Sequence, residues 1–118
     1  MLTITLPFKI ISKSNNYKKG KRSLYKPKDV HNQEDLIKTI TLEACREQQW
    51  LCSTTPVKVT IHCHYKDKRR RDLDNVLKLL LDALNKIVYT DDSLIYELHV
   101  YKHLGTVEET IVTISSLS

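Results

Sequence analysis

The sequence lacks an apolar run long enough to cross a bilayer, and its start lacks the features of a secretory signal. A membrane-spanning helix needs about 20 consecutive, mainly apolar residues, and no segment of the 118 residues approaches that length. Residues 1–5 have neither a charged start nor a long apolar stretch followed by a cleavage site of small residues. The sequence therefore predicts a protein that stays in the cytoplasm.

Cysteine is scarce and irregularly spaced, which argues against two common kinds of small domain. Cys45, Cys52 and Cys63 are odd in number and form no C-x-x-C pair, so neither a zinc finger nor a disulfide framework is favoured. Free, mostly buried thiols in a reducing compartment are expected instead. The chain also has no internal repeats and no low-complexity tail, and residues 1–118 are predicted to form a single domain.

Positive charge is in excess, and the excess lies in two segments. The net charge is +5; residues 1–29 hold eight Lys or Arg against one acid, and residues 65–71 hold five against one. Residues 72–118, in contrast, hold three bases against eight acids. Charge confined in this way favours a polyanionic partner such as nucleic acid over a uniformly basic coat. Two solvated basic loops are the alternative interpretation.

Apolar periodicity predicts the element order β-α-β-α-β-β. Alternation of apolar and polar residues predicts strands over residues 2–6, 57–65, 94–101 and 109–116. Helical spacing predicts one helix over residues 32–50 and another from Asp72 or Asp74 to Ile87. Such a domain is of the α+β class, with a mixed sheet and two main helices. Residues 8–28 are predicted to be a long polar loop, in which Tyr17 and Tyr25 either stack on bases or anchor the loop to the core.

Four consecutive cations stand directly before two carboxylates. The cations are Lys68, Arg69, Arg70 and Arg71. They repel one another unless an anion lies among them, and the carboxylates of Asp72 and Asp74 repel unless a divalent cation bridges them. A phosphodiester held by a metal ion relieves both repulsions. This stretch therefore predicts a Mg²⁺-dependent enzyme that acts on nucleic acid.

Three aspartates can supply a site for a hard cation. Asp72, Asp74 and Asp92 offer oxygen ligands, with Asp91 as the alternative third ligand, and water and phosphate oxygens would complete the shell. A phosphodiester repels a hydroxide nucleophile, whereas a metal polarises the phosphoryl oxygens and lowers the pKa of bound water. The alternative is that these acids are not catalytic, and are only a helix cap and acidic residues of a loop.

Lys78 lies one helical turn after Asp74, on a line that continues to Asp82. Its ammonium can stabilise negative charge that develops on the phosphorane or on the leaving oxygen. The alternative is an ordinary i,i+4 pair with Asp74, which contributes only about 0.3–0.5 kcal/mol. The start of this helix also favours a phosphate near Arg71 and Asn75.

His62 and His64 fall on the same face of the predicted strand over residues 57–65. Two imidazoles on one face suggest a metal site. The sequence shows no third ligand, so two polar residues on the less buried face are the favoured interpretation.

The motif as a whole matches a known family. It consists of the basic run, D-L-D-N at 72–75, a lysine at 78, D-A-L at 82–84 and D-D at 91–92. The I-T-L-P at 4–7 and the S-N-N-Y at 14–17 look like the start of the same family. Over nearly its entire length the chain resembles the RusA family of Holliday junction resolvases.

The resemblance implies a RusA-like fold and a homodimeric endodeoxyribonuclease, which binds four-way DNA junctions and makes paired nicks with Mg²⁺ or Mn²⁺. It implies that Asp72, Asp74 and Asp92 hold the metal, that Lys78 assists catalysis and that Arg71 contacts DNA. The neighbouring Lys68, Arg69 and Arg70, with Asn15 and Asn16, are the further DNA-binding candidates. A phage- or prophage-derived bacterial protein is also implied.

Two other classes of function remain as alternatives. A nucleotidyltransferase also uses a D-x-D pair with a third aspartate, but such enzymes usually place a Gly-Ser pair ahead of the acids, and this chain has none. In a non-catalytic nucleic-acid-binding module, the cations would hold DNA or RNA and the acids would only cap a helix.

Overall fold

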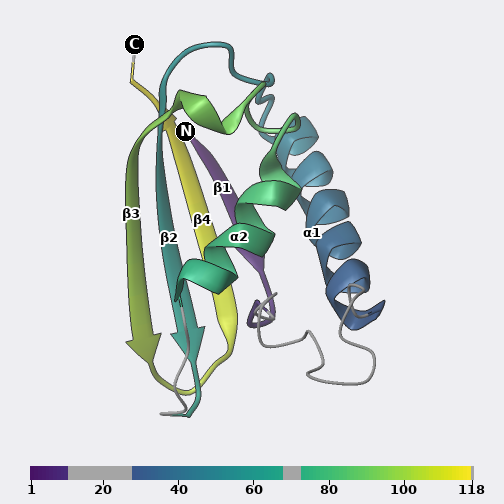
Figure 1. Cartoon of the computed structure of the whole chain (residues 1–118), viewed down its shortest axis with the longest axis vertical. Coiled ribbons are helices and arrows are strands. Elements are labelled where there is room, and N and C mark those ends of the chain that lie inside the picture. The colour runs from purple at the N-terminus through teal and green to yellow at the C-terminus, as the bar shows by residue number, and fades with distance from the viewer. Residues whose placement is uncertain (11–27, 68–72, 118) are drawn as a thin grey trace, which may run out of the picture.

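The computed structural model describes residues 1–10, 28–67 and 73–117. Its elements follow the predicted order, with one short 3-10 helix added (Figure 1). They are β1 (Leu2–Leu6), α1 (Lys28–Glu47), β2 (Val57–Tyr65), α2 (Leu73–Leu84), η2 (Asp92–Leu94), β3 (Ile95–Leu104) and β4 (Glu109–Ser116). The predicted α+β class, with two main helices and a mixed sheet, is confirmed.

The four strands form one sheet in the order β1-β4-β2-β3. β4 pairs antiparallel with both β1 and β2, whereas β2 and β3 are parallel. Parallel neighbours need a crossover connection, usually through a helix, and here α2 and η2 lie in that connection. As Figure 1 shows, α2 crosses in front of the sheet, and α1 lies beside it, in contact with α2 and β1.

The core lies between the two helices and one face of the sheet. Buried residues alternate with more exposed ones along β1, β2 and β4, as the sequence predicted. From α2, the buried side chains are Val76, Leu79, Leu80, Ala83 and Leu84. Full burial of one large aliphatic side chain contributes about 1.5–3 kcal/mol, so the apolar side of α2 fixes which of its residues face solvent.

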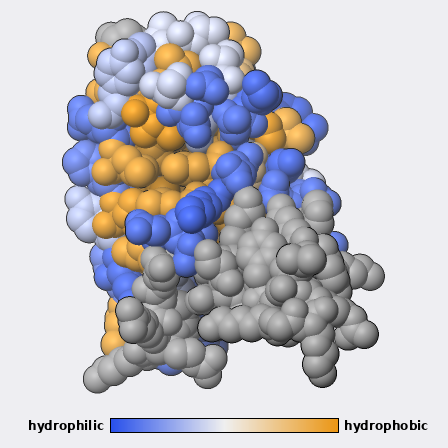
Figure 2. Space-filling view, in the orientation of Figure 1, coloured by the Kyte–Doolittle hydropathy of each residue, from blue (hydrophilic) through white to orange (hydrophobic). Residues whose placement is uncertain are grey.

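β3 is an edge strand, and its apolar residues are only partly covered. The register pairs Val59 with Leu98 and Tyr65 with Leu104, so these residues of β3 point to the helix side of the sheet. Yet Leu98 is 41% and Leu104 54% exposed, and Tyr96 is 69% exposed. Accordingly, Figure 2 shows an apolar area beside α2 on this face of the molecule.

Both helices differ from their predicted ends. α1 spans Lys28–Glu47 instead of 32–50. It ends before Trp50 because Gln49 has a left-handed φ of 57°, and a right-handed helix cannot continue through such a residue. α2 ends at Leu84 instead of Ile87, because Lys86 has a φ of 68°. β3 runs from Ile95 to Leu104 instead of 94–101.

Two smaller expectations can also be compared with the structure. Asp74 lies within the first turn of α2, so it is not the N-cap residue. Cys45 and Cys63 are buried and Cys52 is exposed, and all three thiols are free, as predicted. None of the helices in the described ranges has the length and apolar character needed to span a membrane.

Candidate functional site

The solvent face of α2 carries a row of charged residues. Asp74, Lys78 and Asp82 are all exposed and follow one another at intervals of four residues. Of the apolar residues between them, Val76, Leu79 and Leu80 are buried, and Leu77 and Leu81 are partly buried. A helix rises about 1.5 Å per residue, so adjacent members of this row stand roughly 6 Å apart along the axis. Lys78 therefore occupies the position between two aspartates along the solvent face of the helix.

A second acidic group lies at the other end of α2, around Tyr89. The Tyr89 side chain is fully buried, and its hydroxyl donates to the Leu81 carbonyl over 3.4 Å. Burial raises the pKa of this hydroxyl, and the carboxylates of Asp92 and then Asp82 raise it further. Both carboxylates therefore lie within electrostatic range of the same hydroxyl. Asp82 was not among the predicted site residues, although its i+8 spacing from Asp74 was visible in the sequence.

Asp91 and Asp92 have different surroundings, although both are exposed. Asp91 is the N-cap of η2, and its Oδ2 accepts from the Ser93 backbone N–H at 3.0 Å. Hydrogen bonds from Ser93, with a smaller contribution from Lys86, hold the pKa of the Asp91 carboxyl below its ordinary value. One oxygen of Asp91 is thus committed to the local turn.

The fold places Asp74 and Asp92 at opposite ends of α2. Asp74 follows the end of β2, whereas Asp92 precedes the start of β3. Because β2 and β3 are parallel, those two points lie at opposite ends of the strands, and Figure 1 shows η2 beside the end of α2. With 12 residues, α2 is about 18 Å long. Two ligands of one Mg²⁺ stand only about 4 Å apart, so one chain does not bring these two carboxylates to one ion.

Several predicted residues lie outside the described ranges. These are Asp72, Lys68, Arg69, Arg70, Arg71, Asn15 and Asn16. Within the ranges that are described, no group of three or more His, Cys, Asp or Glu side chains is arranged to hold a metal ion. Asp72 directly precedes α2 in the sequence, and the carboxylates of Asp72 and Asp74 are of the type that a hard cation prefers.

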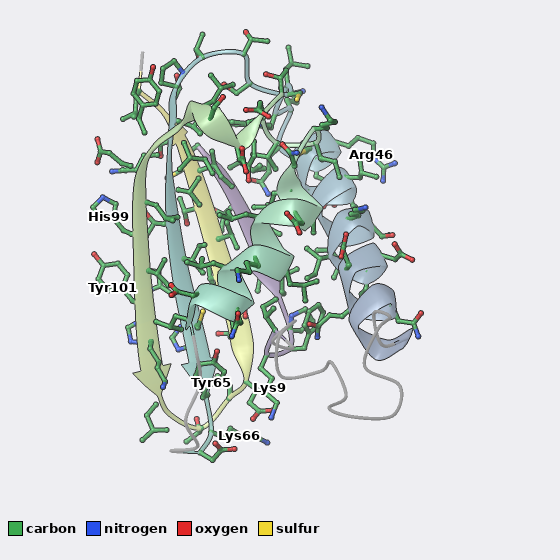
Figure 3. All side chains as sticks on the ribbon, in the orientation of Figure 1. Lys9, Arg46, Tyr65, Lys66, His99 and Tyr101 are labelled. Carbon is green, nitrogen blue, oxygen red and sulfur yellow. The ribbon has the colours of Figure 1, made fainter. Side chains whose placement is uncertain are left out.

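A basic pocket lies at the same end of the molecule as the start of α2. Lys66 follows the end of β2, and together with Lys9 it lines an open cavity of about 560 Å³ between residues 7–9 and 106–108. Figure 3 shows Lys9 and Lys66 close to Tyr65, at the end of β2. Lys9 Nζ lies 3.6 Å from a Glu108 carboxylate oxygen. Sequence reasoning passed over Lys9, because only the fold brings residues 7–9 beside the end of β2.

The fold and site together define a small α+β domain with a basic pocket and an acid–lysine row near one end of its second helix. A basic surface beside acidic residues is typical of proteins that act on nucleic acids. A family model described as Endodeoxyribonuclease RusA matches residues 7–115. Because that match covers nearly the entire chain, the chain belongs to the RusA family.

Curated relatives support the same assignment over a shorter stretch. Proteins named Crossover junction endodeoxyribonuclease RusA, from Escherichia coli (strain K12), Shigella sonnei (strain Ss046) and Enterobacteria phage 82, are each 48% identical to this chain over 48 residues. The matched stretch covers 40% of this chain and 40% of each relative. The similarity to these proteins therefore spans less than half of their length.

Proposed function

We propose that this chain is a single-domain, Mg²⁺-dependent and structure-selective endodeoxyribonuclease. It resolves four-way (Holliday) DNA junctions by paired phosphodiester hydrolysis, in DNA recombination and repair. The observation that carries the proposal is the exposed pair of Asp74 and Lys78 on α2, in a chain that belongs to the RusA family. One relative comes from a phage, which supports a phage or prophage origin. Its DNA substrate places the enzyme in the bacterial cytoplasm.

We assign the metal to Asp72, Asp74 and Asp92, and a structural role to Asp91. Carboxylate oxygens are the ligands that Mg²⁺ prefers, and Mn²⁺ accepts the same ligands. When bound, such an ion polarises a phosphoryl oxygen and lowers the pKa of a coordinated water. The carboxylates of the chain hold the ion and orient the scissile phosphate beside it.

Lys78 acts on the charge that develops as the phosphodiester is cleaved. Its side chain is exposed and stands one turn from Asp74. From this position an ammonium can approach a phosphate held at the start of α2, where it stabilises the phosphorane or the departing oxygen.

A second copy of the chain completes the metal site in this proposal. When two α2 helices pack antiparallel across a two-fold axis, the end of one helix lies beside the start of the other. The partner's Asp92, with the partner's Asp82, then approaches Asp72 and Asp74. Two identical composite sites result, and a four-way junction offers two symmetry-related strands to cut.

The apolar area between β3 and α2 is the surface on which we place the second copy. Leu98 and Leu104 are exposed there, and Leu77 and Leu81 of α2 are only partly buried. An uncovered apolar edge strand invites pairing with another chain. This surface adjoins α2 along its length, which is what a two-fold contact between two α2 helices requires. It therefore suits the same dimer that would build the composite sites.

DNA contact is assigned to the basic residues near the start of α2. The predicted contacts are Lys68, Arg69, Arg70, Arg71, Asn15 and Asn16, and the structure adds Lys9 and Lys66 as candidates, since they line the basic pocket. Cations at this end would hold the phosphates on both sides of the cut, and each phosphate contact makes binding more sensitive to salt. The acids and the cations then act on adjacent parts of one DNA strand.

A synthetic four-way junction tests the proposal directly. We expect the original protein to cut the junction in pairs with Mg²⁺, to leave it uncut without the ion and to spare a linear duplex of the same sequence. Asp74→Asn keeps the size of the side chain but removes its charge, so this variant should bind the junction and fail to cut it. Cleavage by Asp74→Asn at the original rate would exclude Asp74 from the metal site. Binding without cleavage by the original protein would instead indicate a non-catalytic binding module.

A further inference from the structure

Four rings gather on the face of the sheet that points away from the helices. His62 and His64 of β2 alternate with buried residues, and the parallel register pairs them with Tyr101 and His103 of β3. Tyr101 projects away from the sheet at this edge (Figure 3). Spacing along the sequence puts His62 and His64 on one face but shows no third ligand. The pairing of β2 with β3, two segments about 40 residues apart in the chain, supplies a third imidazole.

The three imidazoles are in direct contact. His62 Nδ1 and His103 Nε2 are 2.8 Å apart, which is a hydrogen bond between the two rings. The rings of His64 and His103 stack with centroids 4.6 Å apart and planes at 18°. All three side chains are partly exposed, so an ion from solvent can reach them. The nuclease chemistry proposed above uses none of them.

We propose that His62, His64 and His103 bind one divalent transition-metal ion of the class that prefers imidazole, with Zn²⁺, Ni²⁺ and Cu²⁺ as its members. Imidazole nitrogen suits these ions, whereas Mg²⁺ and Mn²⁺ prefer carboxylate, carbonyl and water oxygens. The site is therefore distinct in chemistry from the aspartates of α2. It lies on the opposite face of the sheet and does not depend on the proposed nuclease function.

Side-chain rotations are needed to form the site, but no movement of the backbone is invoked. The metal ion would replace the hydrogen that His62 and His103 share. Two nitrogens bound to one tetrahedral Zn²⁺ stand about 3.3 Å apart, and the distance between His62 Nδ1 and His103 Nε2 is already close to that, at 2.8 Å. All three rings must rotate, because planes only 15° apart for His62 and His103 and 18° apart for His64 and His103 do not direct the nitrogen lone pairs to one point. That stacking explains why the described side chains do not already form a group arranged to hold a metal ion.

A bound ion would join edge strand β3 to β2, because two of its ligands come from β2 and the third comes from β3. It should therefore stabilise the folded chain, by an amount that grows with the logarithm of the free ion concentration once the site is filled.

Isothermal titration with Zn²⁺ tests the proposal in the full chain. The titration is made in excess Mg²⁺, which occupies hard-cation sites, and in a Cys52→Ser background, because Cys52 is an exposed thiol. We expect one ion per chain. We also expect His103→Gln and His62→Gln each to weaken Zn²⁺ binding by more than the roughly 10–100-fold that loss of an outer-shell partner costs. His99→Gln is the matched control, because His99 lies on the same face of β3 but outside the ring cluster. It should leave the affinity unchanged.

A second measurement needs no histidine variant, so its result does not depend on how a histidine substitution affects folding. In nitrogen-15 NMR spectra of the Cys52→Ser chain, Zn²⁺ should shift the ring signals of His62, His64 and His103 and leave those of His99 in place. Equal shifts at all five histidines would mean that binding is non-specific and would overturn the proposal. So would a His103→Gln variant that binds as tightly as the parent. If the Cys52→Ser chain bound Zn²⁺ as expected but did not cut junctions, only the nuclease proposal would be contradicted.

Discussion

At the scale of single residues, Lys78 offers the most direct test of the chemistry. Because it is exposed on α2, replacing it should leave the fold intact while removing the cation beside Asp74. We expect Lys78→Gln to slow junction cleavage by about 10²–10³-fold, the range for losing one group that stabilises transition-state charge. Single-turnover cleavage at saturating protein measures this loss without a contribution from binding.

The control for the Lys78→Gln variant is the same substitution at Lys86, a second exposed lysine that lies beyond the end of α2. Lys86→Gln makes the same change in net charge, so it should reproduce any general effect on DNA affinity but not the loss of rate. Equal rates for the two variants would remove Lys78 from the catalytic group.

Asp91 and Asp92 are neighbours that the proposal assigns to different tasks. The Asp91 side chain accepts the Ser93 N–H as the cap of η2, and asparagine can accept the same bond. We therefore expect Asp91→Asn to retain cleavage and Asp92→Asn to lose it, with both variants folded by circular dichroism. Cleavage rates in Mg²⁺ decide the point. The opposite pattern would make Asp91 the ligand.

At the scale of secondary-structure elements, the exposed edge of β3 is the test of the proposed dimer. Leu98→Lys places a charge in the middle of the apolar area, and its desolvation in an interface is unfavourable. We expect this variant to be monomeric by size-exclusion chromatography with light scattering, and to lose cleavage because the composite site needs both chains.

The matched control for this substitution is Leu51→Lys, since Leu51 is 86% exposed and lies outside β3 and α2. This variant should keep the mass and the activity of the original protein. A Leu98→Lys variant that remained dimeric would move the interface elsewhere on the molecule.

At the scale of the whole molecule, the proposal can be tested by mixing two inactive chains. When Asp74→Asn and Asp92→Asn chains form a mixed dimer, one composite site carries both substitutions and the other carries neither. The mixed dimer should therefore nick one strand of a junction, although each variant alone cuts nothing. Denaturing electrophoresis of a junction labelled on each strand distinguishes a single nick from paired cuts.

If each chain instead housed a complete site, every site of the mixed dimer would carry one substitution. No nicking would then be observed, and the antiparallel arrangement of the two α2 helices would be wrong. The two original variants, each tested alone at the same total concentration, supply the baseline for both outcomes.

Local spacing was enough to predict the type and the order of the main elements. Strands over 57–65 and 109–116 begin and end where the alternation of apolar residues predicted, because burial of one face fixes a period of two. The predicted order of elements was also correct. The ends of α1 and α2 were not predicted, since they depend on left-handed residues, Gln49 and Lys86, which carry no glycine signal.

Only the tertiary structure decided which side chains lie near one another. Pairing partners of a strand are set by packing of the whole sheet, so neither the parallel pairing of β2 with β3 nor the meeting of His103 with His62 could be predicted from spacing. The same parallel pairing places Asp92 near the end of α2, whereas Asp74 lies at its start. The sequence by itself therefore determined which chemical groups this protein carries, and the path of the chain between β2 and β3 decided their separation.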